Sequence, residues 1–309
     1  MNRLNFHKGW AGVLLWSTLI TGCQSIHPPS APILLEPEPD TLEAKVLSAV
    51  RSYYPNADLR SFRSKEISEW LNQVAPGSRI QKSAPSSLGF IRGLEPELSV
   101  SPAEWLSPTT LYFKISFWGR RTVMEATRQI SSGKERLEQP GGGLIIDLRG
   151  NQGGQLDTAL EMVNAFLPTG ETVVTIRPIR GEDVAYRTSS SDPYRFPVVL
   201  LVDRRTASSA ELFAGILQQQ KRAFLIGTPT TGKDTIQSAI PLDHEHLLLL
   251  TTGYFELPEH PRMSGVGLSP DEIVQEKDDA KDRALTFLQR GQPSISEDLM
   301  ENAQHLPES

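Results

Sequence analysis

The sequence predicts an α/β domain with helices packed on a largely buried sheet. After residue 110, short apolar runs that read as strands alternate with longer stretches in which apolar residues recur at helical spacing. Runs such as GLIIDL (143–148) and PVVLLVD (197–203) are almost wholly apolar, which is typical of strands covered on both faces. Strands and helices that alternate in this way indicate the α/β class.

The expected elements follow one another along the chain. Strands are expected at 111–117, 143–148, 172–177, 197–203, 223–227, 236–242 and 247–253. Helices are expected at 121–136, 156–166, 210–220 and 278–289. Ahead of this core, a helix capped by Asp40 or Thr41 and a short helix around 67–71 form a small helical appendage. A connector over 76–108 carries one expected strand near 88–92.

The amino end has the features of an export signal. Arg3 and Lys8 precede an apolar run that is too short to span a bilayer and ends in Leu-Ile-Thr-Gly-Cys. This end resembles a lipoprotein signal peptide (1–22) followed by a lipidated Cys23, and Cys23 is the only cysteine in the chain. Gln24 after the cysteine resembles the signal for the outer membrane of a Gram-negative cell. We therefore expect an outer membrane lipoprotein that faces the periplasm.

The remaining sequence divides into four parts. Residues 23–40 are rich in proline and form an extended tether. The appendage and connector cover 41–109, the core covers 110–290, and a polar tail covers 291–309. A formal net charge of −6 and the absence of a lysine-arginine run argue against nucleic acid as a partner.

The stretch GTPTTGKDT (227–235) raises the possibility of nucleotide binding. Gly227, Gly232 and Lys233 have the spacing of a phosphate-binding P-loop. A P-loop has Ser or Thr after its lysine to hold magnesium, whereas this sequence has Asp234, whose charge repels phosphate. We therefore expect no nucleotide, and Lys233 needs another role.

A serine nucleophile is the alternative that the residues offer. Ser208 and Ser209 lie between an expected strand and an expected helix, where unpaired N–H groups and the helix dipole favour a developing negative charge. None of the six histidines stands in a small-residue turn after a strand, and His244 and His246 fit a hairpin turn better than a metal site. The base would then be a neutral lysine, whose pKa must fall from about 10.4 to about 7–8 through burial.

Four motifs, in order, resemble peptidase family S41, the C-terminal processing or tail-specific serine proteases. They are GGLIIDLRGNQGGQLDTALEMVNAFLP, TASSAELFAG, GTPTTGKDTIQ and LTTGYFELPEHPRMSGVGLSPD. In that family the nucleophile precedes the base lysine by 25 residues and a glutamate by three. Ser208 has this spacing to Lys233 and to Glu211, whereas the adjacent Ser209 does not.

The resemblance implies a role for each matching residue. Ser208 is the nucleophile, Lys233 the general base, and Gln237 the residue that holds the lysine. Backbone N–H groups of Ser209 and of Gly153 or Gly154 form the oxyanion hole. The implied fold is a crotonase-like (ClpP-like) spiral core, the substrate is a protein or peptide, and no metal or organic cofactor is required.

One difference from typical family members concerns substrate delivery. Residues 76–109 are too few for the PDZ domain that many processing proteases carry between appendage and core. An adaptor protein could therefore deliver the substrate. An alternative function is a non-catalytic lipoprotein that binds peptides or a partner on the same scaffold, because fold does not fix function.

Overall fold

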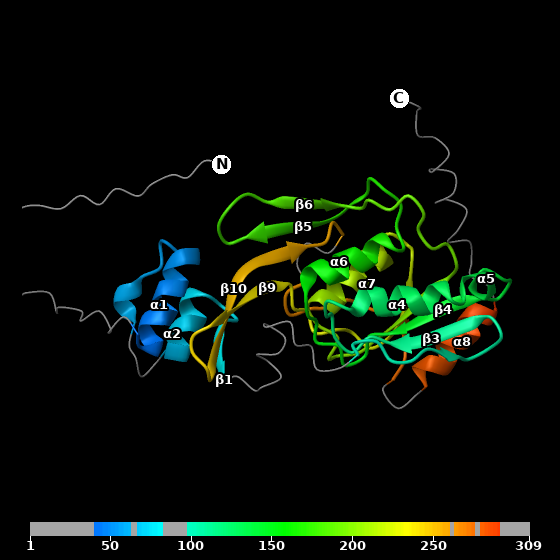
Figure 1. Ribbon diagram of the computed structural model, residues 1–309, viewed down its shortest axis with the longest axis horizontal. Helices are drawn as coiled ribbons and strands as arrows, with labels where there is room; N and C mark the ends of the chain where they lie inside the picture. The colour runs from blue at the N-terminus through cyan, green and yellow to red at the C-terminus, as the bar shows by residue number, and fades with distance from the viewer. Residues whose placement is uncertain (1–39, 63–66, 83–97, 260–262, 276–278, 291–309) are drawn as a thin grey trace, which may run out of the picture. The chain divides into compact units, whose positions relative to one another are not determined.

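Two separate β-sheets, rather than one, organise the part of the chain that the structure describes (Figure 1). The computed structural model describes residues 40–62, 67–82, 98–259, 263–275 and 279–290. Cys23, the tether up to residue 39, the polar tail and the strand expected near 88–92 lie outside these residues. Within the described part, no helix has the length and apolar character needed to cross a bilayer.

The larger sheet has six strands and contains the most deeply buried part of the core. Its order is β11 (Glu272–Ile273), β8 (Phe224–Gly227), β7 (Val198–Val202), β4 (Gly143–Asp147), β3 (Thr110–Lys114) and β2 (Glu104–Trp105). All neighbours are parallel except β2, which runs antiparallel to β3 at the edge. Every residue of β4 and β7 is buried, as their apolar runs predict.

Helices cover both faces of this sheet (Figure 1). One face carries α4 (Thr122–Ser131), α6 (Leu156–Asn164) and α7 (Ser209–Gln219), and the other carries α8 (Ala280–Gln289). Successive residues of β4 divide between these two cores, Leu144 and Ile146 on one side and Ile145 on the other. The doubly covered sheet confirms the α/β class.

The helix expected at 121–136 is broken into α4 and α5 (Lys134–Leu137). The break falls at Gly133, which packs against the Trp105 ring: a Cβ added to Gly133 would lie 2.6 Å from that ring. The periodicity of the sequence continues across the break, so the pattern alone did not reveal it.

The smaller sheet is antiparallel and has five strands. They are β1 (Arg79–Lys82), β5 (Thr172–Pro178), β6 (Val184–Arg187), β9 (Thr235–Pro241) and β10 (His246–Glu256). The long β10 pairs with β1, β5 and β9. Most of β9 is only half-buried, in contrast to β4 and β7. The prediction of one largely buried sheet was therefore wrong for these strands.

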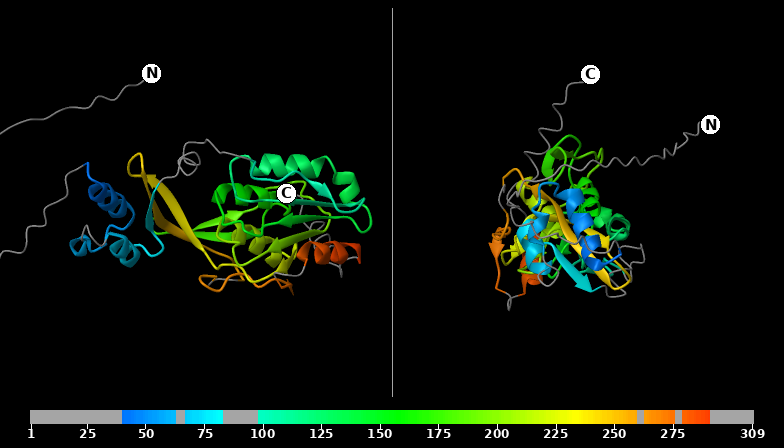
Figure 2. Two further views of the ribbon diagram at one scale, coloured as in Figure 1. Left: turned by 90° about the horizontal axis from the view of Figure 1, so that it is seen from below. Right: turned by 90° about the vertical axis from the view of Figure 1, so that its left-hand side faces the viewer.

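The amino-terminal helices pack on this smaller sheet (Figure 2). They are α1 (Leu42–Tyr53), η1 (Leu59–Ser61) and α2 (Ile67–Val74). Thr41 caps α1, since its Oγ1 accepts a hydrogen bond from Ala44 N at 3.2 Å. Buried residues of α1 and α2 form one apolar cluster with Leu248 and Leu250 of β10, and each buried side chain of this size contributes about 1.5–3 kcal/mol. The helices thus hold the region that leads into β1 against β10.

Candidate active site

Ser208 stands at the turn between β7 and α7 in a strained backbone conformation. Its φ is 56° and its ψ is −123°, and only one other described non-glycine residue, Lys221, has a positive φ. A residue keeps such a conformation only when its surroundings enforce it, and such residues cluster at functional sites. The strain accompanies a serine at a helix amino terminus, where a nucleophile and its oxyanion are favoured.

Glu211 is the group that enforces this turn. Its side chain is completely buried (0% exposed), and its carboxylate accepts hydrogen bonds from Ser208 N at 2.9 Å, Thr230 Oγ1 at 2.5 Å, Gly232 N at 2.6 Å and Lys233 N at 2.9 Å. In the sequence, Glu211 stands out only by its spacing, three residues after Ser208. The structure shows that Glu211 also ties the serine turn to the lysine segment.

The Lys233 side chain is held by a relay of two hydrogen bonds. Its Nζ donates to Gln237 Oε1 at 3.1 Å, and Gln237 Nε2 donates to the carbonyl oxygen of Gly77 at 2.7 Å. The lysine–glutamine contact implied by the resemblance is therefore present. Gly77 was not among the expected site residues, because nothing in the connector sequence marks it.

The pKa of Lys233 is lowered from its ordinary value. Burial is the main cause, the positive charge of Arg79 on β1 acts in the same direction, and the carboxylate of Glu211 opposes both. The opposing carboxylate is thus Glu211 rather than the adjacent Asp234. A lowered pKa raises the fraction of neutral lysine near pH 7, which is the form that can accept a proton.

The glycine segment after β4 lies directly against the serine turn. A Cβ added to Gly153 would lie 2.9 Å from Ser208 Cβ and 3.2 Å from Ser209 N. Gly153 N already donates to Asn151 Oδ1 at 2.9 Å. That bond uses the Gly153 N–H, which favours Gly154 of the two glycines as the oxyanion donor.

The Gly154 peptide is fixed from two sides. Gly154 forms a parallel bridge with Trp118, and its carbonyl oxygen accepts a hydrogen bond from Ser209 Oγ at 3.0 Å. Neither bond uses the Gly154 N–H. The side chain of Ser209 therefore has a structural task, and Ser209 is the first residue of α7.

The candidate catalytic residues share one cavity of about 320 Å³. Ser208, Lys233, Gln237 and Gly154 all line it. Its remaining wall comes from Gln152 and from the smaller sheet, which contributes Ala239, Leu247, Leu249 and Gln81 among others. Gln81 belongs to β1, a strand that the sequence did not reveal. The arrangement places a serine hydroxyl and a half-buried amine in one partly apolar cavity.

The P-loop-like stretch (227–233) and the pair His244 and His246 are the two alternative motifs that the sequence raised. Residues 227–233 lead from β8 into the strand β9 rather than into a helix, so they do not build the helix-terminal phosphate cradle of a P-loop. His244 lies in the turn of the β9–β10 hairpin and His246 begins β10. Among the described residues, no group of three or more His, Cys, Asp and Glu side chains is arranged to hold a metal ion.

Comparison with known proteins finds carboxy-terminal-processing proteases among the relatives of this chain. A carboxy-terminal-processing protease of Bartonella bacilliformis is 36% identical over 135 residues, which cover 43% of this chain and 31% of that protein. A carboxyl-terminal-processing protease of Synechocystis sp. is 33% identical over 152 residues, which cover 49% of this chain and 35% of that protein. The matched part thus spans about a third of the length of these two relatives.

A solved structure of a lipoprotein from Streptococcus agalactiae matches with a TM-score of 0.60 and 16% identity, covering 83% of this chain and 98% of that chain. At this identity the likeness concerns the fold alone. The sequence model of peptidase family S41 matches residues 109–274. This match covers more than half of the chain and includes Ser208, Lys233 and the glycine segment, so the chain belongs to peptidase family S41.

Proposed function

We propose that the protein is a serine endopeptidase in which Ser208 is the nucleophile and Lys233 the general base. The observation that carries the proposal is the cavity lined by both residues, in which Ser208 has a strained backbone and Lys233 has a lowered pKa. Perturbed titratable groups in a cleft are typical of catalytic sites. The family and the named processing proteases among the relatives support the same function.

The proposed reaction is an acyl transfer to water. Neutral Lys233 Nζ takes the proton of Ser208 Oγ as the oxygen attacks the peptide carbonyl carbon. Backbone N–H groups of Ser209 and Gly154 stabilise the oxyanion, each by about 3–4 kcal/mol. The C–N bond then breaks, the leaving amine receives the proton from Lys233, and a serine ester remains. Water, deprotonated by Lys233, cleaves this ester and restores the serine.

Cleavage of an unfolded protein tests this function. The chain should cleave casein, and Ser208→Ala should lower the rate by a factor of about 10⁴ or more, because the covalent route is lost. Ser209→Ala removes only the bond to Gly154 O, worth about 1 kcal/mol, so the rate should fall roughly fivefold. Loss of activity in Ser209→Ala together with full activity in Ser208→Ala would place the nucleophile at the other serine.

The pH profile tests Lys233 as the base. Because the charge of Arg79 lowers the pKa of Lys233, removing it in Arg79→Gln should raise that pKa. The limb of kcat/KM that rises with pH should therefore move to higher pH, with the rate lost at pH 7 and regained in more alkaline buffer. Lys82→Gln removes the same charge from an exposed position of β1 and should leave the limb in place. Equal profiles for the two variants would contradict the assignment.

We further propose that the protein is a lipoprotein of the outer membrane, anchored through Cys23 and facing the periplasm. The support is the signal-like sequence up to Cys23 and the following Gln24. The chain should incorporate labelled palmitate when made in a Gram-negative cell, and Cys23→Ser should not. Labelling that survives this substitution would remove the basis for the anchor.

The substrate is proposed to be an unfolded protein or peptide with an apolar side chain near the cleaved bond. Ala239, Leu247 and Leu249 in the cavity wall support this preference. Because residues 76–109 are too few for a PDZ domain, an adaptor protein is proposed to deliver the substrate. Rapid cleavage of casein by the chain alone would argue against an obligatory adaptor. The buried parallel sheet and the packed amino-terminal helices are consistent with a crotonase-like spiral core carrying a helical appendage.

A further inference from the structure

The relay that holds Lys233 ends on an exposed turn between α2 and β1. Its last acceptor is the carbonyl oxygen of Gly77, and Gln237, which donates to it, lies 160 residues further along the chain. Pro76 and Gly77 are both exposed, and Gly77 has a positive φ of 80°. An exposed turn has few packing contacts of its own, so other groups must hold this carbonyl in place.

Thr251 of β10 holds the turn on both sides of Gly77. Figure 1 shows β1, the strand that follows the turn, beside β10. The Thr251 Oγ1 donates to the carbonyl oxygen of Pro76 at 2.8 Å, and the Thr251 N–H donates to Ser78 Oγ at 2.9 Å. Thr251 is completely buried (0% exposed), and Ser78 is buried as well. Water does not compete for hydrogen bonds at such positions, so these two bonds fix the turn.

The pairing of β9 with β10 places Thr251 directly opposite Gln237. Opposed residues of an antiparallel pair lie on the same face of the sheet and close together. The two side chains donate to successive carbonyl groups of one turn, Thr251 to Pro76 and Gln237 to Gly77. The residue that anchors the turn therefore stands beside the residue that uses it.

The amino-terminal helices hold Thr251 in turn. The hydroxyl of Tyr54, the residue that follows α1, donates to the carbonyl oxygen of Thr251 at 2.8 Å. The N–H, the carbonyl and the hydroxyl of Thr251 are thus all bonded to residues within 54–78. In α2, Asn72 Oδ1 accepts a hydrogen bond from Gly77 N at 3.3 Å. The helical appendage is therefore connected to the candidate base by an unbroken set of hydrogen bonds.

The Gly77 carbonyl determines which end of the Gln237 amide faces Lys233. An amide side chain has an acceptor oxygen and a donor NH₂ group. Because Nε2 donates to Gly77 O, Oε1 faces Lys233 Nζ and accepts its N–H at 3.1 Å. Holding one N–H of a neutral amine also fixes the direction of its lone pair, which is the part that accepts a proton. Without this carbonyl the amide could rotate and present its NH₂ group to the lysine.

We propose that Thr251 is a positioning residue for the general base, acting through the turn at Gly77 and through Gln237. The role rests on the proposed function, because it requires that Lys233 accepts a proton from the serine. Thr251 is not among the described residues that line the catalytic cavity. It therefore acts on the lysine rather than on the substrate, and its loss should lower kcat and leave KM unchanged.

Hydrogen exchange of the Gln237 side-chain amide tests this placement without any reference to cleavage. The full chain would be isotope-labelled at its glutamine side chains, and the Gln237 signal identified by its loss in Gln237→Met. Thr251→Val should speed exchange of this amide by about tenfold or more, the size expected for losing one hydrogen bond. Ser78→Ala removes the second anchor of the turn and should act in the same direction. Thr251→Ser keeps a hydroxyl and should keep exchange slow.

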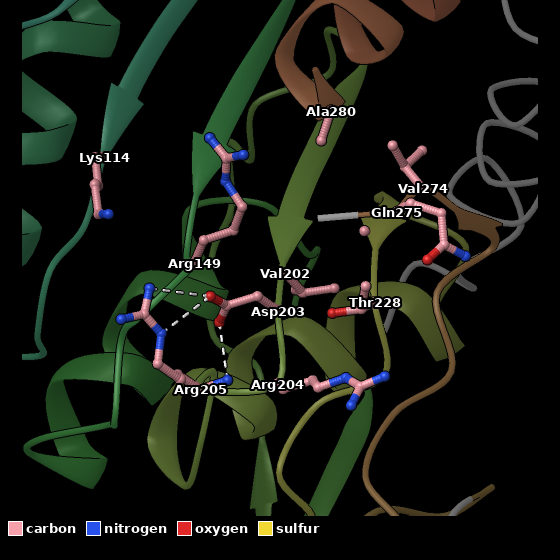
Figure 3. Close-up of a pocket in the computed structure, with 11 residues that line it drawn as sticks. Lys114, Arg149, Val202, Asp203, Arg204, Arg205, Thr228, Val274, Gln275 and Ala280 are labelled. Carbon is pink, nitrogen blue, oxygen red and sulfur yellow. Dashed lines mark hydrogen bonds and ion pairs between the residues drawn. The ribbon is translucent and has the colours of Figure 1, made fainter. Parts of the chain in front are cut away.

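Thr228→Val is the matched control for Thr251→Val. Thr228 is also a buried threonine (7% exposed), and it lines a separate cavity of about 530 Å³ at the carboxyl ends of β7 and β8 (Figure 3). The described residues that line this cavity and the catalytic one are all different. The Thr228 Oγ1 has no hydrogen-bond partner among the described residues, so this substitution breaks no hydrogen bond. Exchange at Gln237 and kcat should both keep their wild-type values.

Casein cleavage then measures the catalytic effect. Thr251→Val should lower kcat by about tenfold or more, because the base is no longer held in line with the serine, and Thr251→Ser should restore most of the rate. In a Gln237→Met background, Thr251→Val should lower kcat by no more than about twofold further, since the two residues act in one chain of contacts. A purely structural role for Thr251 would give the same loss in both backgrounds.

Two results would overturn the proposal. One is equal exchange of the Gln237 amide in the wild-type chain and in folded Thr251→Val, or in Ser78→Ala if Thr251→Val does not fold. The other is the same loss of kcat from Thr251→Val with and without Gln237→Met. A chain that protects the Gln237 amide through Thr251 but cleaves nothing would instead count against the peptidase function and leave the placement of Gln237 standing.

Discussion

Glu211→Gln is expected to lose both stability and activity. The carboxylate accepts four hydrogen bonds in a fully buried position, three of them from backbone N–H groups of Ser208, Gly232 and Lys233. An amide has one acceptor oxygen, and its NH₂ group would face donors. Two unsatisfied buried N–H groups cost about 1–3 kcal/mol each, so the free energy of unfolding should fall by about 2–6 kcal/mol.

Denaturant unfolding and casein cleavage measure the two effects of Glu211→Gln. The serine turn and the lysine segment should separate, so activity should fall even at temperatures where the variant is folded. Glu161→Gln makes the same chemical change at an exposed position of α6 and should be neutral in both measurements. A Glu211→Gln variant with the stability of the wild-type chain would show that these four hydrogen bonds do not hold the site.

Gly154→Ala is expected to lower activity by about a hundredfold or more, since displacing a catalytic group by about 1 Å can have an effect of that size. A Cβ at this position would lie 2.3 Å from the carbonyl oxygen and 2.6 Å from the nitrogen of Trp118. Trp118 is buried against Phe213 and cannot move away easily. The glycine segment must therefore shift, and the Gly154 N–H moves away from the oxyanion.

Gly170→Ala is the matched control for this substitution. Gly170 also has a positive φ, of 106°, but no atom lies within 4 Å of an added Cβ. Backbone strain alone, about 1–2 kcal/mol, should lower its melting temperature without changing kcat at 25 °C. Equal kcat for Gly154→Ala and the wild-type chain would exclude the Gly154 peptide from the oxyanion hole.

The sequence predicts best those strands whose own residues form a continuous apolar run. β4 and β7 are buried along their whole length and read as unbroken apolar runs. β1 is different: it is short and largely polar, and it is a strand because it pairs with β10. The same is true of β6, whose partner is β5. Short strands that are defined by pairing with another strand carry too weak a local pattern to be recognised.

The sequence predicted which residues form the candidate site, but not the groups that hold these residues in place. Ser208, Lys233 and Gln237 follow from the family resemblance, and the structure places all three around one cavity. The Gly77 carbonyl that holds Gln237 lies 160 residues away in sequence, so no local motif could reveal it. Glu211 contacts the lysine segment because α7 packs beside the segment after β8. No local motif could reveal this packing either.

Covalent labelling tests whether Ser208 is a nucleophile activated by Lys233 without knowledge of the substrate or an adaptor. The chain would be treated with a fluorophosphonate, which forms a stable adduct with activated serines, and the modified residue mapped by mass spectrometry. We expect one adduct, on Ser208, which forms faster as the pH rises and is lost in Lys233→Met. Labelling of Ser209, or of Ser208 at the same rate in Lys233→Met, would contradict it, and no labelling at any pH would favour a scaffold that only binds.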